Sequence, residues 1–496
     1  MKVLYIAAEC KPFSKVGGVG DVAGELPPAL KELGVEIEVA TPLYSDRISG
    51  REGLRSQGLF STVREGAREW RLEWLTAEHR SVPIHFLDSP EHFRGDVYIE
   101  SPAERPYWDD AVKFSFFSEA CLDLIAQRNP DVVHVNDWPL GYLLGRMAVK
   151  GLNQARVLTV HNVQYQGNFW EGLLQADSLM HQLLNDCGRV FRDPHADWHC
   201  VNALRLGLES ADMVNTVSPS YAREMTQQPD VGRLFVGGCG LESICAGMYP
   251  EKLVGILNGF EYTSGVTDAA FQVALREKSE ARAAISAGFT QPKNLLLGFV
   301  GRAVEQKFRL LYETLRGKSV VGRLLSIPGV NLAVVATGEQ RYLKFLGGIP
   351  ESRGGVRNFS VTLAYDQLRG GLISRGCDVF LMPSLFEPCG ITQLESMSNA
   401  TPPLVRRTGG LADTVVPHTS PSGTGFVFDG NTREDVLEAL IGSVRDAVNM
   451  FAREPAAFRT LQRNSFGQRF VWAGSAQRYL DEVYKRAVAH SLARHA

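Results

Sequence analysis

Residues 3–40 read VLYIAAECKPFSKVGGVGDVAGELPPALKELGVEIEVA, and this stretch decides the fold. The apolar run at 3–8 predicts a buried strand, residues 22–33 have the periodicity of a helix, and residues 36–40 predict a second strand. A strand, a helix and a strand in this order predict a βαβ unit with parallel strands. Because the strands are apolar throughout, we expect helices to cover both faces of the sheet.

The same alternation continues along the chain. We expect further strands at residues 84–87, 132–135, 157–160, 213–217, 295–300, 332–336, 359–363, 379–382 and 424–428, and a helix at 112–125. A Gly/Cys-rich stretch, GGCGLES, precedes a new strand at 253–257 and favours a boundary near residues 240–256, and the tail predicts a terminal helix. We therefore expect two doubly wound α/β domains, at 1–245 and 246–465, followed by a helix at 466–496. Ligands of such domains bind beyond the carboxyl ends of the strands, here in the cleft between the domains.

Composition excludes several classes of protein. The 496 residues include 52 basic and 55 acidic side chains, and this balance gives no bias toward nucleic acid or an anionic membrane. The longest apolar runs are strand-sized, and the N-terminal MKVLYIAAE lacks the long apolar region of a signal peptide. Eight scattered cysteines form no CxxC pair, which favours reduced thiols and a cytoplasmic location.

The glycine-rich loop after the first strand has two interpretations. Gly18, Gly20 and Ala23 match the weak G-x-G-x-x-A form of a dinucleotide fingerprint. However, the match begins too far after the strand, and VATPLY stands where a ribose-binding carboxylate belongs, so a nicotinamide enzyme is disfavoured. A glycine loop that opens a helix, with Lys15 just upstream, instead favours binding of an anion. The alternative is that Gly17 and its neighbours only form a tight turn.

A series of motifs resembles one known family. In order they are KVGGVGDVAGELP from residue 15, HVNDWPLGY from 134, TVHNVQYQGNF from 159, ADMVNTVSPSYAREM from 211, GRAVEQK from 301, PSLFEPCGITQLESM from 383 and VRRTGGLADTV from 405. Together they resemble the bacterial glycogen synthases and plant starch synthases over nearly the whole chain. The resemblance implies a GT-B fold, in which two Rossmann-like domains face each other and a C-terminal helix crosses back to the first. It also implies retaining transfer of glucose from ADP-glucose to the non-reducing end of an α-1,4-glucan such as glycogen.

The resemblance assigns roles to particular residues. The implied catalytic residues are Arg302, Lys307, Glu387, His161 and Asp137. The implied donor-binding residues are Lys15, Gly17, Gly18, Cys389, Gly390, Ile391, Glu395, Thr408, Gly409 and Gly410, and the acceptor-binding residues are Asn162, Tyr165 and Gln166. The residues themselves suit these roles, since a G-R-x-x-x-x-K spacing after a strand places two cations where a leaving diphosphate needs neutralisation.

We expect no metal and no cofactor beyond the donor substrate. Cys187, His195, His199 and Cys200 lack the paired short spacings of a closed zinc site. The chain has no Asp-x-Asp, and Arg302 and Lys307 would replace a cation on the diphosphate. The expected partners are a nucleotide sugar and a glucan, with no nucleic acid and no membrane. The sequence does not set the oligomeric state.

Departures from the family pattern keep alternatives open. They are Phe308, Glu261, Ala336, Ala400 and Arg205, together with the unusual segments 172–200 and 347–358. One alternative is another retaining GT-B hexosyltransferase with a different nucleotide sugar or acceptor, and a second is a glucan-binding homologue without activity. The joint presence of Lys15, Asp137, His161, Arg302, Lys307 and Glu387 argues against loss of activity.

Overall fold

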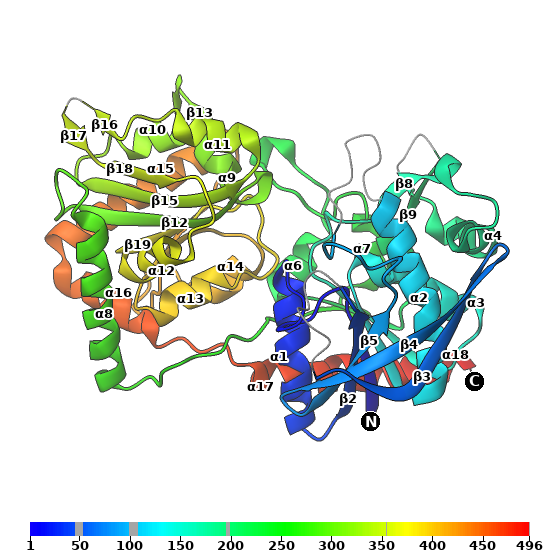
Figure 1. Cartoon of the computed structure of the whole chain (residues 1–496). Helices are drawn as coiled ribbons and strands as arrows, with labels where there is room; N and C mark the ends of the chain where they lie inside the picture. The colour runs from blue at the N-terminus through cyan, green and yellow to red at the C-terminus, as the bar shows by residue number, and fades with distance from the viewer. Residues whose placement is uncertain (45–52, 99–107, 195–198, 354, 496) are drawn as a thin grey trace.

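The computed structural model describes residues 1–44, 53–98, 108–194, 199–353 and 355–495. Figure 1 shows two α/β domains side by side, the first in blue to green and the second in green to orange. The last segment, in red, runs from the second domain back beneath the first. This is the doubly wound two-domain architecture that the sequence predicts.

In the first domain the described residues form a nine-stranded sheet in the order β11-β10-β7-β6-β1-β2-β5-β4-β3. All neighbours are parallel from β11 to β5, and the pairs β5–β4 and β4–β3 are antiparallel. The strands are β1 (Lys2–Ile6), β2 (Glu36–Pro42), β3 (Arg55–Glu65), β4 (Arg68–His79), β5 (Val82–Asp88), β6 (Val132–Asn136), β7 (Ala155–Val160), β10 (Met213–Thr216) and β11 (Leu253–Gly255).

Helices cover both faces of this sheet. On one face lies α1 (Gly18–Glu32), whose Val22, Leu26 and Leu30 are spaced four residues apart and fully buried. On the opposite face, the apolar side chains of the sheet pack against α2 (Trp108–Arg128), α3 (Gly141–Val149), α4 (Leu179–Phe191) and α5 (Ala203–Ser210). Covered faces explain the continuous apolar character of the central strands.

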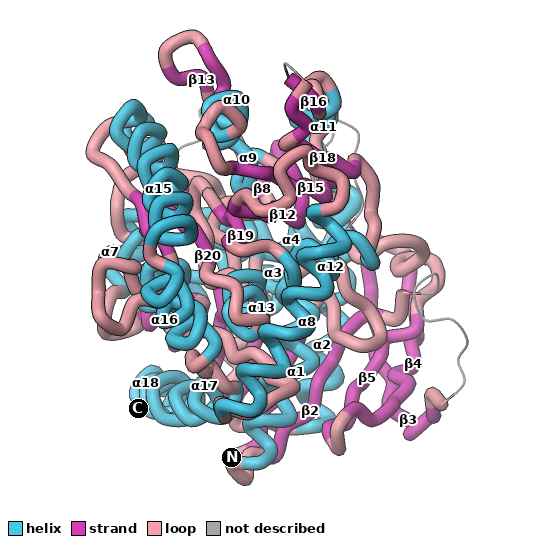
Figure 2. Tube along the Cα trace, turned by 90° about the vertical axis from the view of Figure 1, so that its left-hand side faces the viewer, coloured by secondary structure: helices cyan, strands magenta, loops and turns pink. Residues whose placement is uncertain are grey.

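The second domain repeats the arrangement with a six-stranded parallel sheet of described residues, in the order β18-β15-β12-β19-β20-β21. Its strands are β12 (Leu295–Ala303), β15 (Val330–Gly338), β18 (Phe359–Thr362), β19 (Val379–Met382), β20 (Pro403–Arg406) and β21 (Phe426–Phe428). Figure 2 shows helices around this sheet: α8 (Asp268–Ser286), α9 (Glu305–Tyr312), α10 (Val320–Leu324), α11 (Gln340–Gly347), α12 (Gln367–Gly376), α13 (Thr392–Ser398), α15 (Arg433–Arg453) and α16 (Pro455–Phe466). A further helix, α14 (Gly409–Thr414), is labelled in Figure 1.

The C-terminal segment packs against the first domain. It comprises α17 (Trp472–Arg478), the π-helical turn η4 (Tyr479–Tyr484) and α18 (Lys485–His495). The Tyr479 hydroxyl accepts a hydrogen bond from Asn215 Nδ2 (2.8 Å), and the Tyr484 hydroxyl lies 2.8 Å from His134 Nδ1. These buried contacts confirm the expected helix that crosses back.

Three details of the organisation differ from the sequence prediction. The strand expected to open the second domain, β11, instead pairs in parallel with β10, so the first sheet extends past the expected boundary at residue 245. The long hairpin β3–β4 and the strand β20 had no predicted counterpart. In β3, residues 55–58 are exposed, so this strand lacks the apolar run that identified the others.

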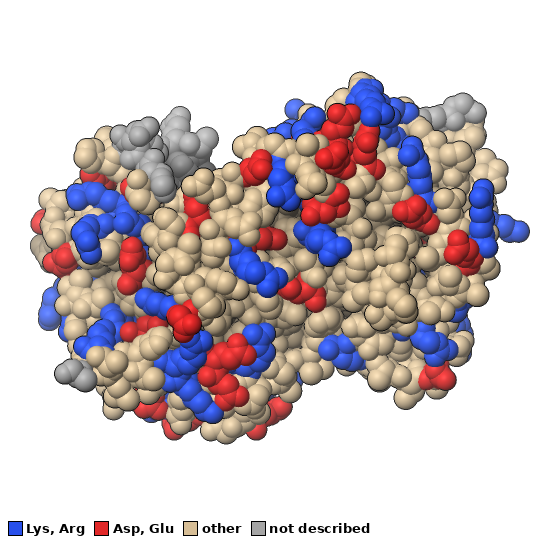
Figure 3. Space-filling view, turned by 180° about the vertical axis from the view of Figure 1, so that it is seen from behind, with Lys and Arg blue, Asp and Glu red and all other residues tan. Residues whose placement is uncertain are grey.

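The remaining elements are short. They are β8 (Asn168–Trp170), β9 (Cys200–Asn202), β13 (Thr314–Leu315), β14 (Lys318–Ser319), β16 (Ser352–Arg353), β17 (Val356–Arg357), α6 (Pro219–Glu224), α7 (Glu242–Met248), η1 (Trp138–Leu140), η2 (Glu171–Leu173) and η3 (Val231–Arg233). Within the described part of the chain, no helix combines the length and apolar character needed to cross a membrane. On the face drawn in Figure 3, basic and acidic side chains alternate without a patch of one sign.

Candidate active site

The first part of the site lies where β6 and β7 end. Asp137 follows β6, and its Oδ1 accepts a hydrogen bond from the His161 amide (2.6 Å) just beyond β7. Its φ of +56° is uncommon for a residue other than glycine, which indicates backbone strain of the kind that clusters at functional sites. The side chain is buried, and this burial raises the pKa of Asp137 from its ordinary 3.8 to about 7.

His161 lies beside Asp137 with a partly exposed side chain. Its Nε2 is 2.9 Å from the Oδ1 of Asn136, the last residue of β6. Desolvation by the surrounding protein lowers the pKa of His161 to about 3, so the imidazole is neutral at physiological pH. The structure therefore brings two predicted catalytic residues together at the sheet edge where ligands bind.

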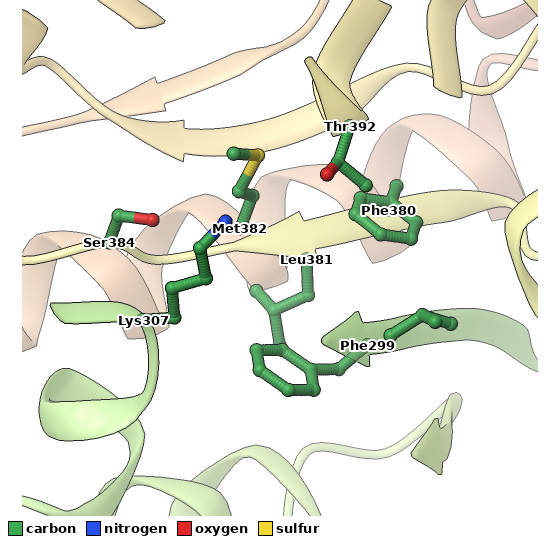
Figure 4. Close-up of a pocket in the computed structure, with 8 residues that line it drawn as sticks. Phe299, Lys307, Phe380, Leu381, Met382, Ser384 and Thr392 are labelled. Atoms are coloured by element: carbon green, nitrogen blue, oxygen red, sulfur yellow. The ribbon is translucent and has the colours of Figure 1, made fainter. Parts of the chain in front are cut away.

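The second part of the site lies at the carboxyl ends of β12 and β19. Lys307 on α9 forms an ion pair with Glu387 (3.5 Å), and the Ser384 hydroxyl donates a hydrogen bond to the same Glu387 oxygen (3.1 Å). Figure 4 shows Lys307 extending toward Met382 and Ser384, beside a pocket with about 250 Å³ of empty space that includes open solvent. Lys307 and Glu387 thus place a cation and a carboxylate together at the carboxyl ends of these strands.

Arg302 belongs to the same edge of the sheet. It is the next-to-last residue of β12, and its side chain is exposed. Among the described residues it has no ion-pair partner. A guanidinium held on a strand end and not engaged by a carboxylate is available to a phosphate.

Gly409 and Gly410 are required by close packing against the loop of Glu387. A Cβ on Gly409 would lie 2.0 Å from the carbonyl oxygen of Glu387, and one on Gly410 would lie 2.2 Å from that of Cys389. The Gly410 amide donates to the Glu387 carbonyl (3.0 Å). The two glycines therefore hold the loop that carries Glu387, and their direct contact with a donor stays a prediction.

The start of α14 also has a partner from the other domain. Glu224, at the end of α6, accepts hydrogen bonds from the Gly409 amide (2.7 Å) and the Thr408 hydroxyl (3.1 Å). Nearby, Ser218 donates to the carbonyl of Pro388 (2.6 Å). Thr408 and Gly409, which were predicted to bind the donor, thus form hydrogen bonds to Glu224 of the other domain. Glu224 was not predicted, because the motif in which it lies has no residue pattern that indicates binding or catalysis.

The glycine loop of the first domain already holds a carboxylate. The buried Glu9 accepts hydrogen bonds from the amides of Val16 and Gly17 (3.0 Å to Gly17), and desolvation by burial raises its pKa. The amide of Gly17 predicted to bind an anion therefore binds Glu9 in this structure. Gly18 is exposed, and a Cβ there would meet nothing within 4 Å, so the outer side of the loop has room for a ligand.

Lys15 and Glu395 bring the two domains' predicted donor residues near each other. Lys15 is half exposed and pairs with Asp21 (2.7 Å). Partial desolvation raises the pKa of Glu395, an effect that the charges of Arg375 and Lys15 partly offset. Glu387 and Glu395 do not share a helix, because α13 begins only at Thr392; Cys389, Gly390 and Ile391 precede it.

The three predicted acceptor residues differ in availability. Tyr165 is 46% exposed, and Asn162 is partly exposed. Gln166 is buried, donates to the carbonyls of Val163 (3.0 Å) and Cys239 (2.9 Å), and accepts from Asn202 (2.7 Å). Its side-chain amide forms these three hydrogen bonds inside the protein, so the assignment of Gln166 to the acceptor stays a prediction that this conformation does not support.

Metal ligation finds no support among the residues that the structure describes. There, no group of three or more His, Cys, Asp and Glu side chains could hold a metal ion. Of the four residues considered for zinc, His195 lies outside the described residues, and Cys187 and Cys200 are free thiols like the other six cysteines.

The departures from the family pattern have local explanations. Phe308 is fully buried against Phe299, Tyr342 and Phe345, where it fills the space behind α9. Glu261 forms an ion pair with Arg80 (2.7 Å). Ala400 has a φ of +53°, a conformation that glycine adopts more readily than alanine.

Two other departures lie in different surroundings. Ala336 is buried within β15. The Arg205 guanidinium donates to the carbonyl of Arg192.

Comparison with known proteins gives the chain a family. A starch synthase catalytic domain model matches residues 2–246, and a model of group 1 glycosyl transferases matches residues 290–451. Glycogen synthase 1 of Methylococcus capsulatus is 33% identical over 99% of this chain and 97% of its own length. Glycogen synthase of Desulfitobacterium hafniense is 33% identical over 98% of this chain and 99% of its own.

Solved structures agree. The catalytic domain of starch synthase IV from Arabidopsis thaliana, bound to ADP and acarbose, superposes with a TM-score of 0.79 at 27% identity and covers 98% of this chain and 99% of its own. Sucrose-phosphate synthase from Thermosynechococcus elongatus, with a TM-score of 0.56 at 16% identity over 98% of this chain and 99% of its own, shares the fold. The fold is therefore GT-B, and the chain belongs to the glycogen and starch synthase family of glycosyltransferases.

Proposed function

We propose that this enzyme is a glycogen synthase, which transfers glucose from ADP-glucose to the non-reducing end of an α-1,4-glucan with retention of configuration. The observation that carries the proposal is the ion pair of Lys307 and Glu387 at the carboxyl ends of β12 and β19. A cation for a diphosphate and a carboxylate for sugar hydroxyls lie side by side there, as a nucleotide sugar requires. The full-length likeness to glycogen synthases supports the choice of substrates.

Arg302 and Lys307 act on the leaving group in this proposal. As the bond between the glucose C1 and the diphosphate breaks, negative charge grows on the departing ADP, and the two cations stabilise that charge. The acceptor hydroxyl forms the new bond to C1 and gives its proton to a phosphate oxygen of the leaving ADP. No protein side chain is needed as a general base, and no metal ion is needed beside the two cations.

Glu387, Asp137 and His161 act on the sugar. The carboxylates of Glu387 and Asp137 accept hydrogen bonds from glucose hydroxyls, which orients the ring and favours the positive charge that develops at C1. The neutral imidazole of His161 adds a further polar contact without opposing that charge. Tyr165, with its exposed ring, offers a face on which a glucan unit can stack.

The setting of this enzyme is part of the proposal. We place it in the cytoplasm, which eight free cysteines support, with the glucan and the nucleotide sugar as its partners.

The test is glucan synthesis by the purified protein. ADP-glucose carrying labelled glucose is incubated with glycogen, and the polymer is then digested with β-amylase, which releases maltose only from α-1,4-linked non-reducing ends. We expect labelled maltose from the wild type and almost none from Lys307→Ala, while Lys318→Ala, on an exposed hairpin of the same domain, serves as the matched control. Label that stays in ADP-glucose or resists β-amylase would refute the proposal.

A further inference from the structure

Asn136 is the last residue of β6, and it lies next to Asp137 and His161 at the carboxyl end of the first sheet. We propose that Asn136 is a positioning residue that fixes the tautomer of His161, so that Nε2 carries the proton and Nδ1 stays an acceptor for a sugar hydroxyl. This role rests on the proposed function, which places a sugar against His161. Asn136 is 1% exposed, so it acts through His161 and does not touch a substrate itself.

The orientation of the Asn136 amide follows from its partners. Nδ2 donates a hydrogen bond to the carbonyl of Ile6 on the neighbouring strand (3.0 Å). Because a carbonyl can only accept, the nitrogen must face Ile6 and the amide oxygen must face the opposite way. On that side Oδ1 accepts a hydrogen bond from the Tyr5 hydroxyl (2.9 Å) and lies 2.9 Å from His161 Nε2.

The tautomer of His161 follows from this orientation. An amide oxygen has no proton to donate, so the contact is a hydrogen bond only if Nε2 is protonated. A neutral ring protonated at Nε2 leaves Nδ1 as an unprotonated acceptor. No described residue forms a hydrogen bond with Nδ1, and the ring is partly exposed, so this nitrogen is available to a ligand hydroxyl.

The groups around His161 strengthen the preference for the Nε2–H tautomer. Tyr5 on β1 and Asn136 on β6 are buried, so Nε2 faces the protein interior, where a hydrogen bond is stronger than in water. The other polar groups near the ring are the carboxylate of Asp137, which accepts from the His161 backbone amide, and the buried imidazole of His134. Among the residues that the structure describes, Asn136 is the one hydrogen-bond partner of Nε2, and it therefore specifies the tautomer.

The test combines a spectroscopic and a kinetic measurement on the full-length enzyme. Nitrogen-15 NMR of histidine-labelled protein distinguishes a protonated from an unprotonated ring nitrogen, and a His161→Gln variant assigns the signals. The variants are Asn136→Ala, which removes the acceptor, and Asn136→Asp, which keeps an oxygen toward Nε2 in either protonation state. The matched control is Asn331→Ala, because Asn331 is an equally buried strand asparagine that donates to a carbonyl (2.8 Å) in the other domain.

We expect the wild type to show a neutral His161 with the proton on Nε2 alone. Asn136→Ala should mix the two tautomers and lower kcat with ADP-glucose by about tenfold or more, with KM changed by less than about twofold. Asn136→Asp should restore the Nε2–H tautomer and most of kcat, and Asn331→Ala should change neither. A wild-type ring with the proton on Nδ1, or an unchanged tautomer in a folded Asn136→Ala, would overturn the proposal.

The tautomer is read in the free protein without any substrate. It therefore separates the two claims: a protein inactive with every nucleotide sugar but holding the Nε2–H tautomer refutes the proposed function, whereas an active enzyme without that tautomer refutes the role of Asn136. If Asn136→Ala fails to fold, the wild-type spectrum and Asn136→Asp still decide the question.

Discussion

Asp137→Asn should make the protein more stable at alkaline pH while it removes activity. The Asp137 carboxyl is buried, and this burial raises its pKa from 3.8 to about 7. A raised pKa means that the ionised form is disfavoured in the folded state. The stabilising contribution is complete below pH 3.8 and is lost as the pH rises through about 7. Asparagine has no charge to bury, and its oxygen can still accept the hydrogen bond from the His161 amide.

The size of the effect follows from the same two values. The interval between 3.8 and about 7 corresponds to about 4 kcal/mol in the free energy of unfolding at pH 8, and to about 1.5 kcal/mol at pH 5. The backbone should not add to this, because asparagine tolerates the positive φ of this position at least as well as aspartate. Activity should fall by at least about a hundredfold, since the ionised carboxylate is proposed to bind the sugar.

The assay is urea unfolding followed by tryptophan fluorescence at several pH values. Six of the seven tryptophans lie before residue 200, and Trp472 opens the helix α17 that packs against α1, so fluorescence reports on the first domain. Asp131→Asn is the matched control, because Asp131 is exposed and also accepts a backbone hydrogen bond (2.7 Å). If the gain of Asp137→Asn does not grow between pH 5 and pH 8, or matches that of Asp131→Asn, the burial of Asp137 does not strain the fold.

Three further changes have defined outcomes. Lys307→Ala should lower kcat by about 10²–10³-fold, because the leaving diphosphate loses a cation, and steady-state kinetics that leave kcat near the wild-type value would remove Lys307 from the mechanism. Glu224→Ala should lower the free energy of unfolding by about 1–2 kcal/mol, because the first amide of α14 loses its hydrogen-bond acceptor from the other domain. Urea unfolding followed by circular dichroism, which reports on both domains, measures this loss, and an unchanged urea midpoint would contradict it. Phe308→Ala should cost about 3–5 kcal/mol in the same assay, because it opens a cavity in the aromatic cluster behind α9, and a loss below about 1 kcal/mol would mean that the cluster closes around the gap.

The fold was largely predictable because its strands are buried on both faces. Apolar runs identify such strands without knowledge of their neighbours, and β19 was predicted to the residue. The hairpin β3–β4 escaped because it lies at the edge of the sheet with one face toward water. The sheet to which β11 belongs was not predicted, because a strand's own sequence does not say which sheet it joins; β11 pairs with β10 only through contacts distant in sequence.

The candidate site shows the same division. Asp137 and His161 follow strands of the first sheet, and Lys307 and Glu387 follow strands of the second. Parallel topology alone brings such residues to the carboxyl edge of each sheet. The sequence does not show in this way which protein groups form hydrogen bonds with the residues predicted to bind the donor or the acceptor. The carboxylate of Glu9 accepts from an amide of the glycine loop, and that of Glu224, on α6, accepts from the first amide of α14. The local sequence pattern assigns both amides to the donor, and such pairings exist only after the chain has folded.

Transfer from competing donors tests the central claim most directly. Purified enzyme is given glycogen with labelled ADP-glucose or labelled UDP-glucose in parallel, and kcat/KM is measured for each from the label incorporated into the polymer. The account predicts rapid incorporation from ADP-glucose, with kcat/KM at least about tenfold higher than from UDP-glucose, which is about 1.4 kcal/mol of transition-state binding. Equal use of the two donors, a preference for UDP-glucose, or no incorporation from either would contradict it.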